Sequence, residues 1–571
     1  MDYNEIYERW VQLAHDPAIK RELVAIEDNE LEKESRFGAS LTFGTAGLRG
    51  ILGAGTNRMN IYTVRRATQG MADYIKERFG DGSVAIAYDS RNMSRKFGEE
   101  CASVLAANGI TAYIYDSLMP TPMLSFAVRE LGARTGIMIT ASHNPAEYNG
   151  YKAYGEDGCQ MTSEAANSVY EKIQSVDEFD GVKYIGFAKG LLAGAIKYID
   201  EKVAESYYEQ VLNQQINAGI CKKYPVKLVY SPLNGTGNKP VRRILSEIGV
   251  SEISIVREQE LPDGNFPTCT YPNPETKEAL KLGLELCEKE KPDMFIATDP
   301  DADRVGVAFK NAGGGYTILS GNEIGVLLLD YIIKARRALN TMPKNPVAVE
   351  SIVSTAMAAD IARKNGVEMR TVLTGFKYIG EQILHLERQG QEQRFIFGFE
   401  ESCGYLSGSY VRDKDAVFAA MILCEMTSFY KSKNTSPIAV LDALYEEYGY
   451  YRHRVLNFEF GGIDGQQQMA AVMDKLFANN PKKIAGFEVC AVSDYKAGVK
   501  KDTATGKSVR IELPEATAIE FELDNGASVM VRPSGTEPKM KLYMTAKEKT
   551  EKQSQEVLSA LADDMKELLG L

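Results

Sequence analysis

The residues Thr140-Ala141-Ser142-His143-Asn144-Pro145 continue an apolar run, RTGIMIT at 134–140, which predicts a short buried strand. Small and turn-forming residues place Ser142 on a tight loop at the end of that strand, where a hydroxyl can meet a substrate. Ser142 is therefore either part of a plain turn, or a nucleophile or phosphate carrier. A serine hydrolase is not expected, because no G-x-S-x-G surrounds Ser142 and the adjacent His143 would be badly aimed to act as its base.

A second loop carries three carboxylates at intervals of two residues. Residues 293–308 read DMFIATDPDADRVGVA, in which an apolar strand runs into Asp299, Asp301 and Asp303. Such oxygen ligands suit Mg²⁺ or Ca²⁺, and without a cation they would repel one another. An EF-hand is not expected, because its sixth position needs Gly and is Arg304. The alternatives are a cation site and a solvated acidic turn, and the adjacent Arg304 also favours a substrate anion.

A third loop has the composition of a phosphate site. The segment Arg532-Pro533-Ser534-Gly535-Thr536-Glu537-Pro538-Lys539 lies between two strand-like segments. A guanidinium, two hydroxyls and the N–H groups that Gly exposes are the groups that hold a phosphate dianion. No Walker A pattern occurs here, and a plain hairpin loop is the alternative.

A fourth segment, GFEESCGY at 398–405, follows the apolar run 395–397. Adjacent carboxylates and a serine at a strand end suit sugar hydroxyls. By itself this signal is weak, because Glu-Glu-Ser is also common at ordinary helix starts.

In this order, the four segments TASHNP, DPDADR, GFEESCGY and RPSGTEPK resemble the motifs of the α-D-phosphohexomutase superfamily, which contains phosphoglucomutases and phosphomannomutases. Each motif is short, but four in register over about four hundred residues are specific. The segment FGTAGLRG at 43–50 is similar to the family's N-terminal loop. The length and the extra N-terminal segment most resemble the longer phosphoglucomutase/phosphopentomutase branch.

The resemblance implies an α/β fold with three related α/β domains and a smaller C-terminal α+β domain around a central cleft. The expected domains are 1–204 with the phosphoserine loop, 205–320 with the metal loop, 321–452 with the sugar loop, and 453–571 with the phosphate loop. Alternating helices and strands, expected near 60–79, 83–90, 95–108 and 111–116, independently indicate α/β layers. The sequence shows no strong internal repeat.

The resemblance also implies a role for each site residue. Ser142 would be the phosphoserine, and Asp299, Asp301 and Asp303 would hold Mg²⁺ together with an oxygen of its phosphate. Residues near the transferring phosphate would be Arg49, His143, Lys152 and Lys414. Substrate-binding residues would be Arg304, Lys377 of the TGFK segment, Glu400 and Ser402 at the sugar, and Arg532, Ser534, Gly535 and Thr536 at the phosphate that does not react.

The implied reaction moves a phosphate between two carbons of a sugar. Phosphoserine 142 would donate to a sugar 1- or 6-phosphate, and the resulting bisphosphate would turn over and return its other phosphate. The leading expectation is interconversion of glucose 1-phosphate and glucose 6-phosphate, with Mg²⁺ and glucose 1,6-bisphosphate as cofactor and activator. The alternatives are a phosphopentomutase, a phosphomannomutase, a glucose 1,6-bisphosphate synthase, a phosphatase, or a sugar-phosphate sensor that binds without turnover.

Composition limits the partners. The chain has 571 residues, a net charge of −12 and eight cysteines without a C-x-x-C pair. These values predict several domains, no nucleic-acid partner, and free thiols in a reducing cytoplasm. The first twenty residues are charged and do not read as a signal peptide, and no run reaches the ~20 apolar residues of a membrane span. Phosphosugars are the expected partners, with the chain as monomer or homodimer.

Overall fold

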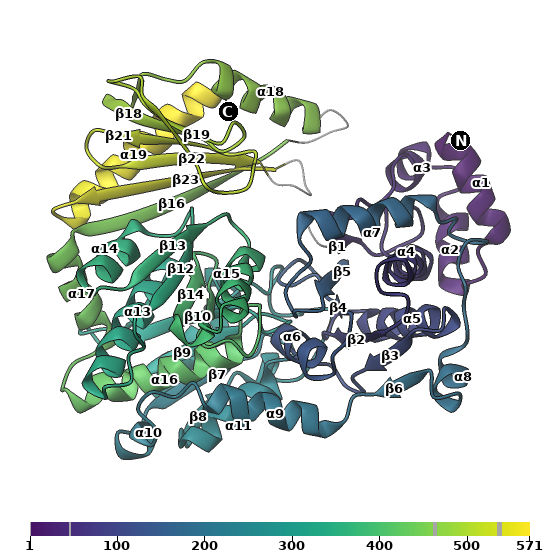
Figure 1. The fold of residues 1–571 in the computed structure, drawn as a ribbon, viewed down its shortest axis with the longest axis horizontal. Helices are drawn as coiled ribbons and strands as arrows, with labels where there is room; N and C mark the ends of the chain where they lie inside the picture. Colours follow the sequence, from purple (N-terminus) through teal and green to yellow (C-terminus); the bar gives the residue numbers. More distant parts are fainter. Residues whose placement is uncertain (1, 45–46, 461–464, 534–538, 571) are drawn as a thin grey trace.

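The computed structural model describes residues 2–44, 47–460, 465–533 and 539–570, which form four sheet-based units (Figure 1). The first unit starts with three helices: α1 (Tyr3–Leu13), α2 (Pro17–Ala25) and α3 (Glu30–Phe37). Its mixed sheet has the order β1-β5-β4-β2-β3-β6. The strands are β1 (Gly47–Ile51), β2 (Ser83–Tyr88), β3 (Thr111–Ile114), β4 (Thr135–Ile139), β5 (Tyr148–Gly155) and β6 (Ile196–Tyr198). The remaining helices are α4 (Ile61–Phe79), α5 (Ser94–Ala107), α6 (Thr121–Glu130), α7 (Ser163–Ser175) and α8 (Phe187–Leu192).

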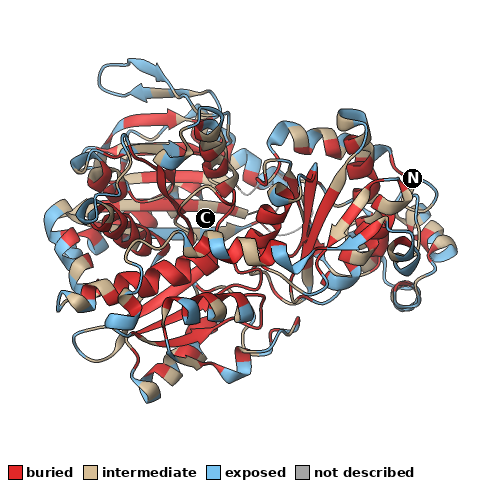
Figure 2. Cartoon of the chain, turned by 60° about the horizontal axis from the view of Figure 1, so that its bottom comes forward, coloured by how far each residue is buried: buried red, intermediate tan, exposed pale blue. Residues whose placement is uncertain are grey.

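Both faces of this first sheet are buried, because successive side chains of a strand point to opposite faces. On β2, Val84 and Ile86 pack in a cluster with α4, α5 and α7, whereas Ala85 and Ala87 pack with α6 and with the core of the next units. Figure 2 shows the strands as buried and the outer faces of the helices as exposed. The first unit is therefore joined to the others through a shared apolar core.

The second and third units repeat the α/β plan. The second has the sheet order β11-β10-β9-β7-β8 and the third β13-β12-β14-β15. The second contains α9 (Glu201–Leu212), α10 (Ile220–Lys223), β7 (Lys227–Ser231), α11 (Asn238–Ile248), β8 (Glu252–Ile255), α12 (Lys277–Glu290), β9 (Met294–Thr298), β10 (Val305–Lys310) and β11 (Tyr316–Leu319). The third contains α13 (Gly321–Ala338), β12 (Val347–Ser351), α14 (Ala356–Lys364), β13 (Glu368–Val372), α15 (Phe376–Arg388), β14 (Phe395–Glu400), β15 (Gly404–Leu406), α16 (Ala416–Ser432) and α17 (Pro437–Tyr448).

The fourth unit is a larger, antiparallel sheet with the order β16-β23-β22-β21-β18-β19-β20. Its elements are β16 (Tyr450–Glu459), α18 (Gly465–Ala478), β17 (Lys483–Ile484), β18 (Phe487–Asp494), β19 (Val499–Asp502), β20 (Ser508–Arg510), β21 (Ile519–Leu523), β22 (Ser528–Pro533), β23 (Lys539–Glu548) and α19 (Glu551–Leu569). On β22, Val529 and Val531 face α19, whereas Met530 packs against Val353 and Leu373 of the third unit. The other face of the sheet therefore borders the third unit. Three α/β units followed by this unit confirm the predicted fold class.

The first three units share one local topology. In each, a strand of the parallel part of the sheet is followed by a short loop and an antiparallel neighbour: β4 with β5, β9 with β10, and β14 with β15. A short loop can join only antiparallel neighbours, whereas a parallel connection needs a long crossover. These loops carry Ser142, the Asp299 to Asp303 cluster and Glu401 to Cys403. The structure thus contains a repeat that the sequence does not reveal.

Local chemistry accounts for the helix limits that the sequence predicts. The Asn60 side chain accepts from the N–H groups of Tyr62 and Thr63, which starts α4, and Gly80 at φ 80° ends it. Ser320 and Glu323 form a capping box that starts α13. Within the described ranges, no helix is long and apolar enough to cross a membrane.

Candidate active site

Ser142 lies in a constrained turn directly after β4. Its backbone has φ 53°, a left-handed conformation that non-glycine residues seldom adopt, and its N–H donates to Thr140 Oγ1 over 2.8 Å. The side chain is buried, and Oγ donates to Asp299 Oδ2 over 3.0 Å. The serine loop and the carboxylate loop, 157 residues apart in the chain, are therefore in direct contact.

His143 faces its neighbour, contrary to the sequence-based expectation that it would be badly aimed. Its Nδ1 lies 3.2 Å from Ser142 Oγ, within hydrogen-bond distance. The turn at Ser142 brings the two side chains to the same side. Burial, together with the positive charges of Arg304 and Arg49, holds the pKa of His143 well below its ordinary value. The ring is therefore neutral near pH 7.

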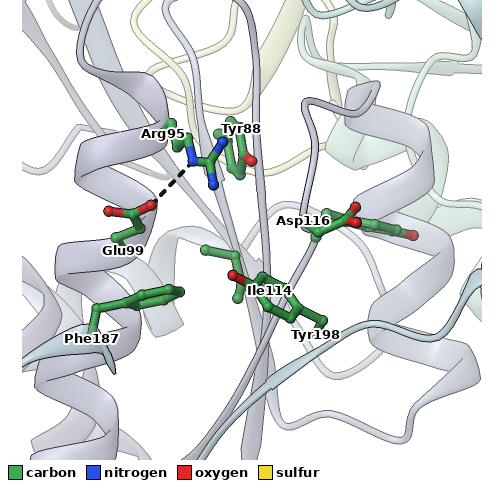
Figure 3. A pocket seen from close by; sticks show the side chains of 8 residues that line it. Tyr88, Arg95, Glu99, Ile114, Asp116, Phe187 and Tyr198 are labelled. Atoms are coloured by element: carbon green, nitrogen blue, oxygen red, sulfur yellow. Dashed lines mark hydrogen bonds and ion pairs between the residues drawn. The ribbon is translucent and has the colours of Figure 1, made fainter. Parts of the chain in front are cut away.

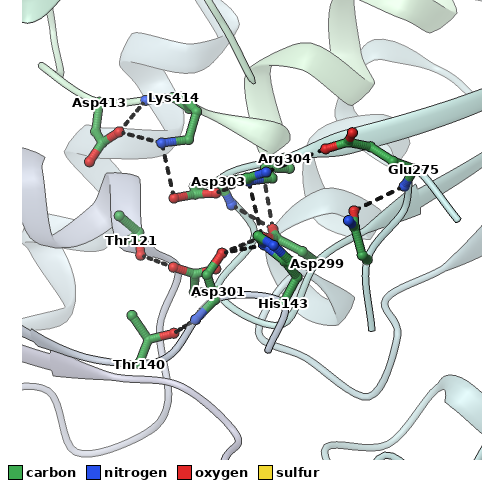
Figure 4. A network of polar contacts seen from close by, with 12 residues as sticks. Thr121, Thr140, His143, Glu275, Asp299, Asp301, Asp303, Arg304, Asp413 and Lys414 are labelled. Atoms are coloured by element: carbon green, nitrogen blue, oxygen red, sulfur yellow. Dashed lines mark hydrogen bonds and ion pairs between the residues drawn. The ribbon is translucent and has the colours of Figure 1, made fainter. Parts of the chain in front are cut away.

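The three aspartates converge as predicted. Asp299, Asp301 and Asp303 are buried, and each offers a carboxylate oxygen within 4.8 Å of the others. Figure 4 shows the cluster with Thr121 of the first unit on one side and Lys414 of the third on another. Thr121 Oγ1 donates to Asp301 Oδ2 over 2.8 Å. The cluster is thus the point at which three units meet.

Cations surround these carboxylates. Lys152 Nζ lies 2.7 Å from Asp301 Oδ2 and 3.3 Å from Asp303 Oδ2, and Lys414 Nζ lies 3.2 Å from the same Asp303 atom. Arg304 Nε lies 3.7 Å from Asp303 Oδ1. Burial alone would lower the pKa of Lys152 and Lys414, but the carboxylates outweigh it and raise both values. The two lysines therefore stay charged in the interior of the protein.

Glu400 and Ser402 lie in the third unit at the corresponding loop. Glu400 is the last residue of β14, and its Oε1 accepts from the Gly375 N–H over 2.7 Å, so the TGFK segment is tied to the sugar motif. Burial raises the Glu400 pKa, and Lys414 opposes that effect. Ser402 is half-buried in the turn before β15. Lys377 is the second residue of α15 and lines a groove of about 560 Å³ between α15 and the first unit.

Arg49 and Arg532 approach the site from the two ends of the chain. Arg49 is on β1 opposite Gly150 of β5, and its Nη1 donates to Asn144 Oδ1 of the serine loop over 3.4 Å. Arg532 is on β22, next to Lys541 of β23. Burial and Glu401 of the third unit raise the pKa of Tyr543, while Arg532 opposes them. Ser534, Gly535 and Thr536 lie outside the described residues.

Sequence reasoning missed several residues that complete the site. Asp413 accepts from both Lys414 Nζ, over 3.0 Å, and the buried Tyr154 hydroxyl, over 2.7 Å. Arg91, directly after β2, donates to the backbone of the serine loop. The only local signal was the placement of Asp89 and Arg91 at the end of an apolar strand. A separate small pocket in the first unit is lined by Tyr88, Arg95 and their neighbours and by none of the described site residues (Figure 3).

Four family models match the chain. They describe α/β/α domains I, II and III and the C-terminal domain of phosphoglucomutase/phosphomannomutase, over residues 40–180, 205–314, 320–448 and 471–567. The phosphoglucomutase of Staphylococcus saprophyticus subsp. saprophyticus is 38% identical over 517 residues, which are 90% of this chain and 92% of the relative. The phosphoglucomutase of Staphylococcus aureus is 36% identical over 544 residues, or 95% of each chain.

Solved structures share the fold at lower identity. Parafusin, a phosphoglucomutase from Paramecium in its open form, has a TM-score of 0.67 and 18% identity, covering 93% of this chain and 96% of its own. A phosphoglucomutase/phosphomannomutase family protein from Burkholderia thailandensis has a TM-score of 0.65 and 19% identity, covering 92% and 97%.

The phosphoglucomutase relatives, which match nearly the whole chain, imply an isomerase of the phosphotransferase type. With family models that match all four parts, the chain belongs to the phosphoglucomutase/phosphomannomutase family. The bacterial relatives named above, which match nearly the whole chain, are phosphoglucomutases.

Proposed function

We propose that this enzyme interconverts glucose 1-phosphate and glucose 6-phosphate through a phosphoserine at Ser142, with glucose 1,6-bisphosphate as intermediate and activator. The observation that carries the proposal is the contact of 3.0 Å between Ser142 Oγ and Asp299 Oδ2, within a buried ring of lysines and carboxylates. Phosphoglucomutase relatives over 90% or more of the chain support glucose as the sugar.

The charges around Ser142 suit a phosphate carrier. A phosphoserine brings about −1.5 to −2 charges. Lys152, Lys414 and Arg304 lie at the carboxylate cluster that Ser142 contacts, and Arg49 reaches the serine loop. Phosphoryl transfer depends mainly on positioning and charge neutralisation, and these cations supply both.

The carboxylate cluster has the properties of a Mg²⁺ site. Among the described residues, Asp301 Oδ1 and Asp303 Oδ1 are buried without a hydrogen-bond partner, and a buried acceptor without a partner is costly. A cation held by Asp299, Asp301, Asp303 and a phosphate oxygen on Ser142 would satisfy these atoms. When bound, Mg²⁺ would offset the charge of the transferring phosphoryl group.

His143 and the lysines have distinct parts in this scheme. The proton of Ser142 Oγ must leave when the serine takes up a phosphate and must return when the serine releases it. If the hydroxyl turns from Asp299 toward the neutral His143 ring, whose Nδ1 lies at 3.2 Å, this ring would take and return the proton. Lys152 and Lys414, which stay protonated, would stabilise the oxygens of the transferring group.

The other two loops would hold the sugar. Glu400 and Ser402 would bind hydroxyls that both orientations of the sugar present, and Lys377 would contact the substrate beside them. Arg532, together with Ser534, Gly535 and Thr536, would bind the phosphate that is not reacting, whichever carbon bears it. The two parallel N–H groups of an arginine bind the phosphate oxygens, so they recognise the anion whichever carbon of the sugar bears it.

We propose domain limits of 1–204, 205–320, 321–452 and 453–571. Each of the first three ranges contains one whole sheet, and the limits at 204 and 452 fall inside α9 and β16. The eight cysteines, all free thiols, support a reducing cytoplasm as the site of action. Phosphosugars are the proposed partners, and the chain would act as a monomer or homodimer.

The deciding experiment is conversion of glucose 1-phosphate to glucose 6-phosphate with Mg²⁺ and catalytic glucose 1,6-bisphosphate. The wild-type protein should turn over rapidly, and Ser142→Ala should be inactive while its thermal unfolding is unchanged. Wild-type-like activity of Ser142→Ala would remove this serine from the mechanism. Relative kcat/KM on glucose, mannose and ribose 1-phosphates tests the sugar, and a clear preference for the pentose would overturn the proposed substrate.

A further inference from the structure

One buried guanidinium holds the whole serine loop. Arg91 is 3% exposed, and its Nη1 donates to the carbonyls of Pro145, over 2.8 Å, and Tyr148, over 3.1 Å. Its Nη2 donates to the carbonyl of Ser142, over 2.6 Å, and to that of Asn144. Four carbonyls of a loop shorter than ten residues therefore converge on a single side chain.

The hydrogen bonds from Arg91 stabilise the strained backbone of the serine loop. A non-glycine residue with positive φ, such as Ser142 at 53°, persists only where its surroundings over-determine it. The planar guanidinium can bond several carbonyls at fixed angles, whereas a lysine ammonium is a point charge that cannot reproduce this geometry. Arg91 is itself anchored, because its backbone N–H donates to Asp89 Oδ1 over 3.0 Å and its Nε lies 3.5 Å from Asp89 Oδ2.

The second unit covers this guanidinium. Arg91 Cζ lies 4.9 Å from the centre of the Phe266 ring, and Asn92 Nδ2 donates to Asn265 Oδ1 over 3.0 Å. Gly264 packs so closely that a Cβ at this position would lie 2.4 Å from Asn92 N. The loop at 264–266 belongs to the unit that also carries the three aspartates. The packing of the loop at 264–266 against Arg91 and Asn92 therefore connects the serine loop to the unit that carries the carboxylate loop.

We infer that Arg91 is a positioning residue for Ser142. Its guanidinium holds the serine loop so that Oγ points at Asp299. Phe266, which belongs to the carboxylate-bearing unit, covers the guanidinium. This inference rests on the proposed mutase function. It adds a residue that touches no substrate and acts only through the backbone of the loop. A displacement of about 1 Å at a reacting group can cost about a hundredfold in rate, which sets the expected effect.

The test compares Arg91→Met and Arg91→Lys with Arg65→Met as a matched control. Arg65 is a partly buried arginine of the same unit, bonded to the buried Glu100 over 2.5 Å, and within the described residues it has no hydrogen bond or ion pair to the serine loop. Arg91→Met should lower kcat about a hundredfold while KM for glucose 1-phosphate changes less than threefold. Arg91→Lys should recover part of the loss, and Arg65→Met should keep kcat within about twofold.

Amide hydrogen exchange of the peptide covering 140–150 provides a readout that does not depend on activity. Exchange should become faster in Arg91→Met and stay unchanged in Arg65→Met. If Arg91→Met does not fold, Gly264→Ala replaces it, because it displaces the covering loop without changing Arg91. It should lower kcat with little effect on KM.

Several results would overturn the inference: wild-type kcat in Arg91→Met, an equal loss in Arg65→Met, or unchanged exchange at 140–150. If Gly264→Ala is used instead, a wild-type kcat in that variant would also overturn the inference. An inactive wild-type protein would instead disprove the proposed function, and exchange at 140–150 would then still decide whether Arg91 holds the loop.

Discussion

Asp299 and Asp303 are the same type of residue and lie four positions apart, yet the structure shifts their pKa values in opposite directions. Burial and the charges of Asp301 and Asp303 raise the pKa of Asp299 well above its ordinary value. Burial also acts on Asp303, but Lys414, Lys152 and Arg304 outweigh it and lower that pKa. The strongest opposing charges at Asp303, those of Lys414 and Lys152, belong to other units, so the identity of the side chain alone does not account for the difference.

Removing the charge of one aspartate of the cluster should abolish the increase in Tm that Mg²⁺ causes. We expect MgCl₂ at about 10 mM to raise the Tm of the wild-type protein by several degrees, because a ligand that binds only the folded state stabilises it. Asp301→Asn, which keeps the shape and removes the charge, should lose this increase. Asp116→Asn, at an exposed aspartate outside the site, is the control. A full Mg²⁺ response in Asp301→Asn would refute the metal assignment.

Glu350 on β12 allows a pH prediction away from the site. It is 4% exposed, its Oε2 has no hydrogen-bond partner within the described part of the chain, and burial raises its pKa to about 8. The folded state therefore keeps the Glu350 carboxyl protonated, whereas the unfolded state releases this proton once the pH exceeds the ordinary pKa near 4.5. The stabilising contribution is fully present below that value and is lost as pH rises toward 8.

Glu350→Gln should remove this dependence. We expect the Tm of the variant to exceed that of the wild-type protein by a few degrees at pH 8.5, and this advantage to shrink at pH 5.5. Differential scanning calorimetry at the two pH values measures it. An equal difference at both pH values would show that Glu350 does not titrate as described.

At the scale of elements, the N-terminal helices support the strand that carries Arg49. Glu22 of α2 accepts from Arg36 Nη1 of α3 and from the Ala54 N–H, both over 2.8 Å, so the helices are bonded to the turn after β1. Trp10 of α1 is fully buried, and its Nε1 donates to Glu178 Oε1 over 3.2 Å. Residues 2–38 are thus part of the first unit's core.

Trp10→Ala should destabilise this unit. Loss of a fully buried tryptophan costs about 3–5 kcal/mol. Urea unfolding followed by circular dichroism should show an earlier transition of the first unit. Trp10→Phe, which keeps most of the aromatic packing, should lose less. Identical unfolding of the wild-type protein and Trp10→Ala would mean that α1 is not docked. Because Trp10 is the only tryptophan of the chain, its fluorescence in the wild-type protein reports the same docking.

At the scale of the whole molecule, the fourth unit contacts the third through a small apolar cluster and a few polar bonds. Met530 and Tyr543 pack with Val353 and Leu373, and Lys547 Nζ lies 3.1 Å from Asp360 Oδ2. Figure 1 shows this unit above the third and apart from most of the first. A small, partly polar contact of this kind permits relative movement of domains.

Arg532→Ala should weaken substrate binding. A lost hydrogen bond to a charged group costs about 1.5–3 kcal/mol, which corresponds to roughly a tenfold to hundredfold increase in KM for glucose 1-phosphate. Steady-state kinetics measure it, with Arg510→Ala in the exposed hairpin of the same unit as control. If Arg532→Ala and Arg510→Ala have the same KM, Arg532 does not bind the distal phosphate.

Much of this protein follows from local sequence. The strands before Ser142 and Asp299, the limits of α4 and the four motifs depend on residues close together in the chain. Periodicity and capping act over a few residues, so the sequence was enough to predict them. The convergence of the three aspartates also followed, because their spacing in one loop limits how far apart they can lie.

Only the tertiary structure decided how these parts meet. Thr121 and Asp301 are 180 residues apart, Tyr154 and Asp413 are 259 apart, and Arg91 reaches the serine loop across 51 residues. The turn that points His143 at Ser142 and the loop position shared by the first three units likewise depend on how sheets pair and pack. Such contacts join side chains without any sequence periodicity. Burial then sets their charges, because desolvation and neighbouring groups act through space and not along the chain.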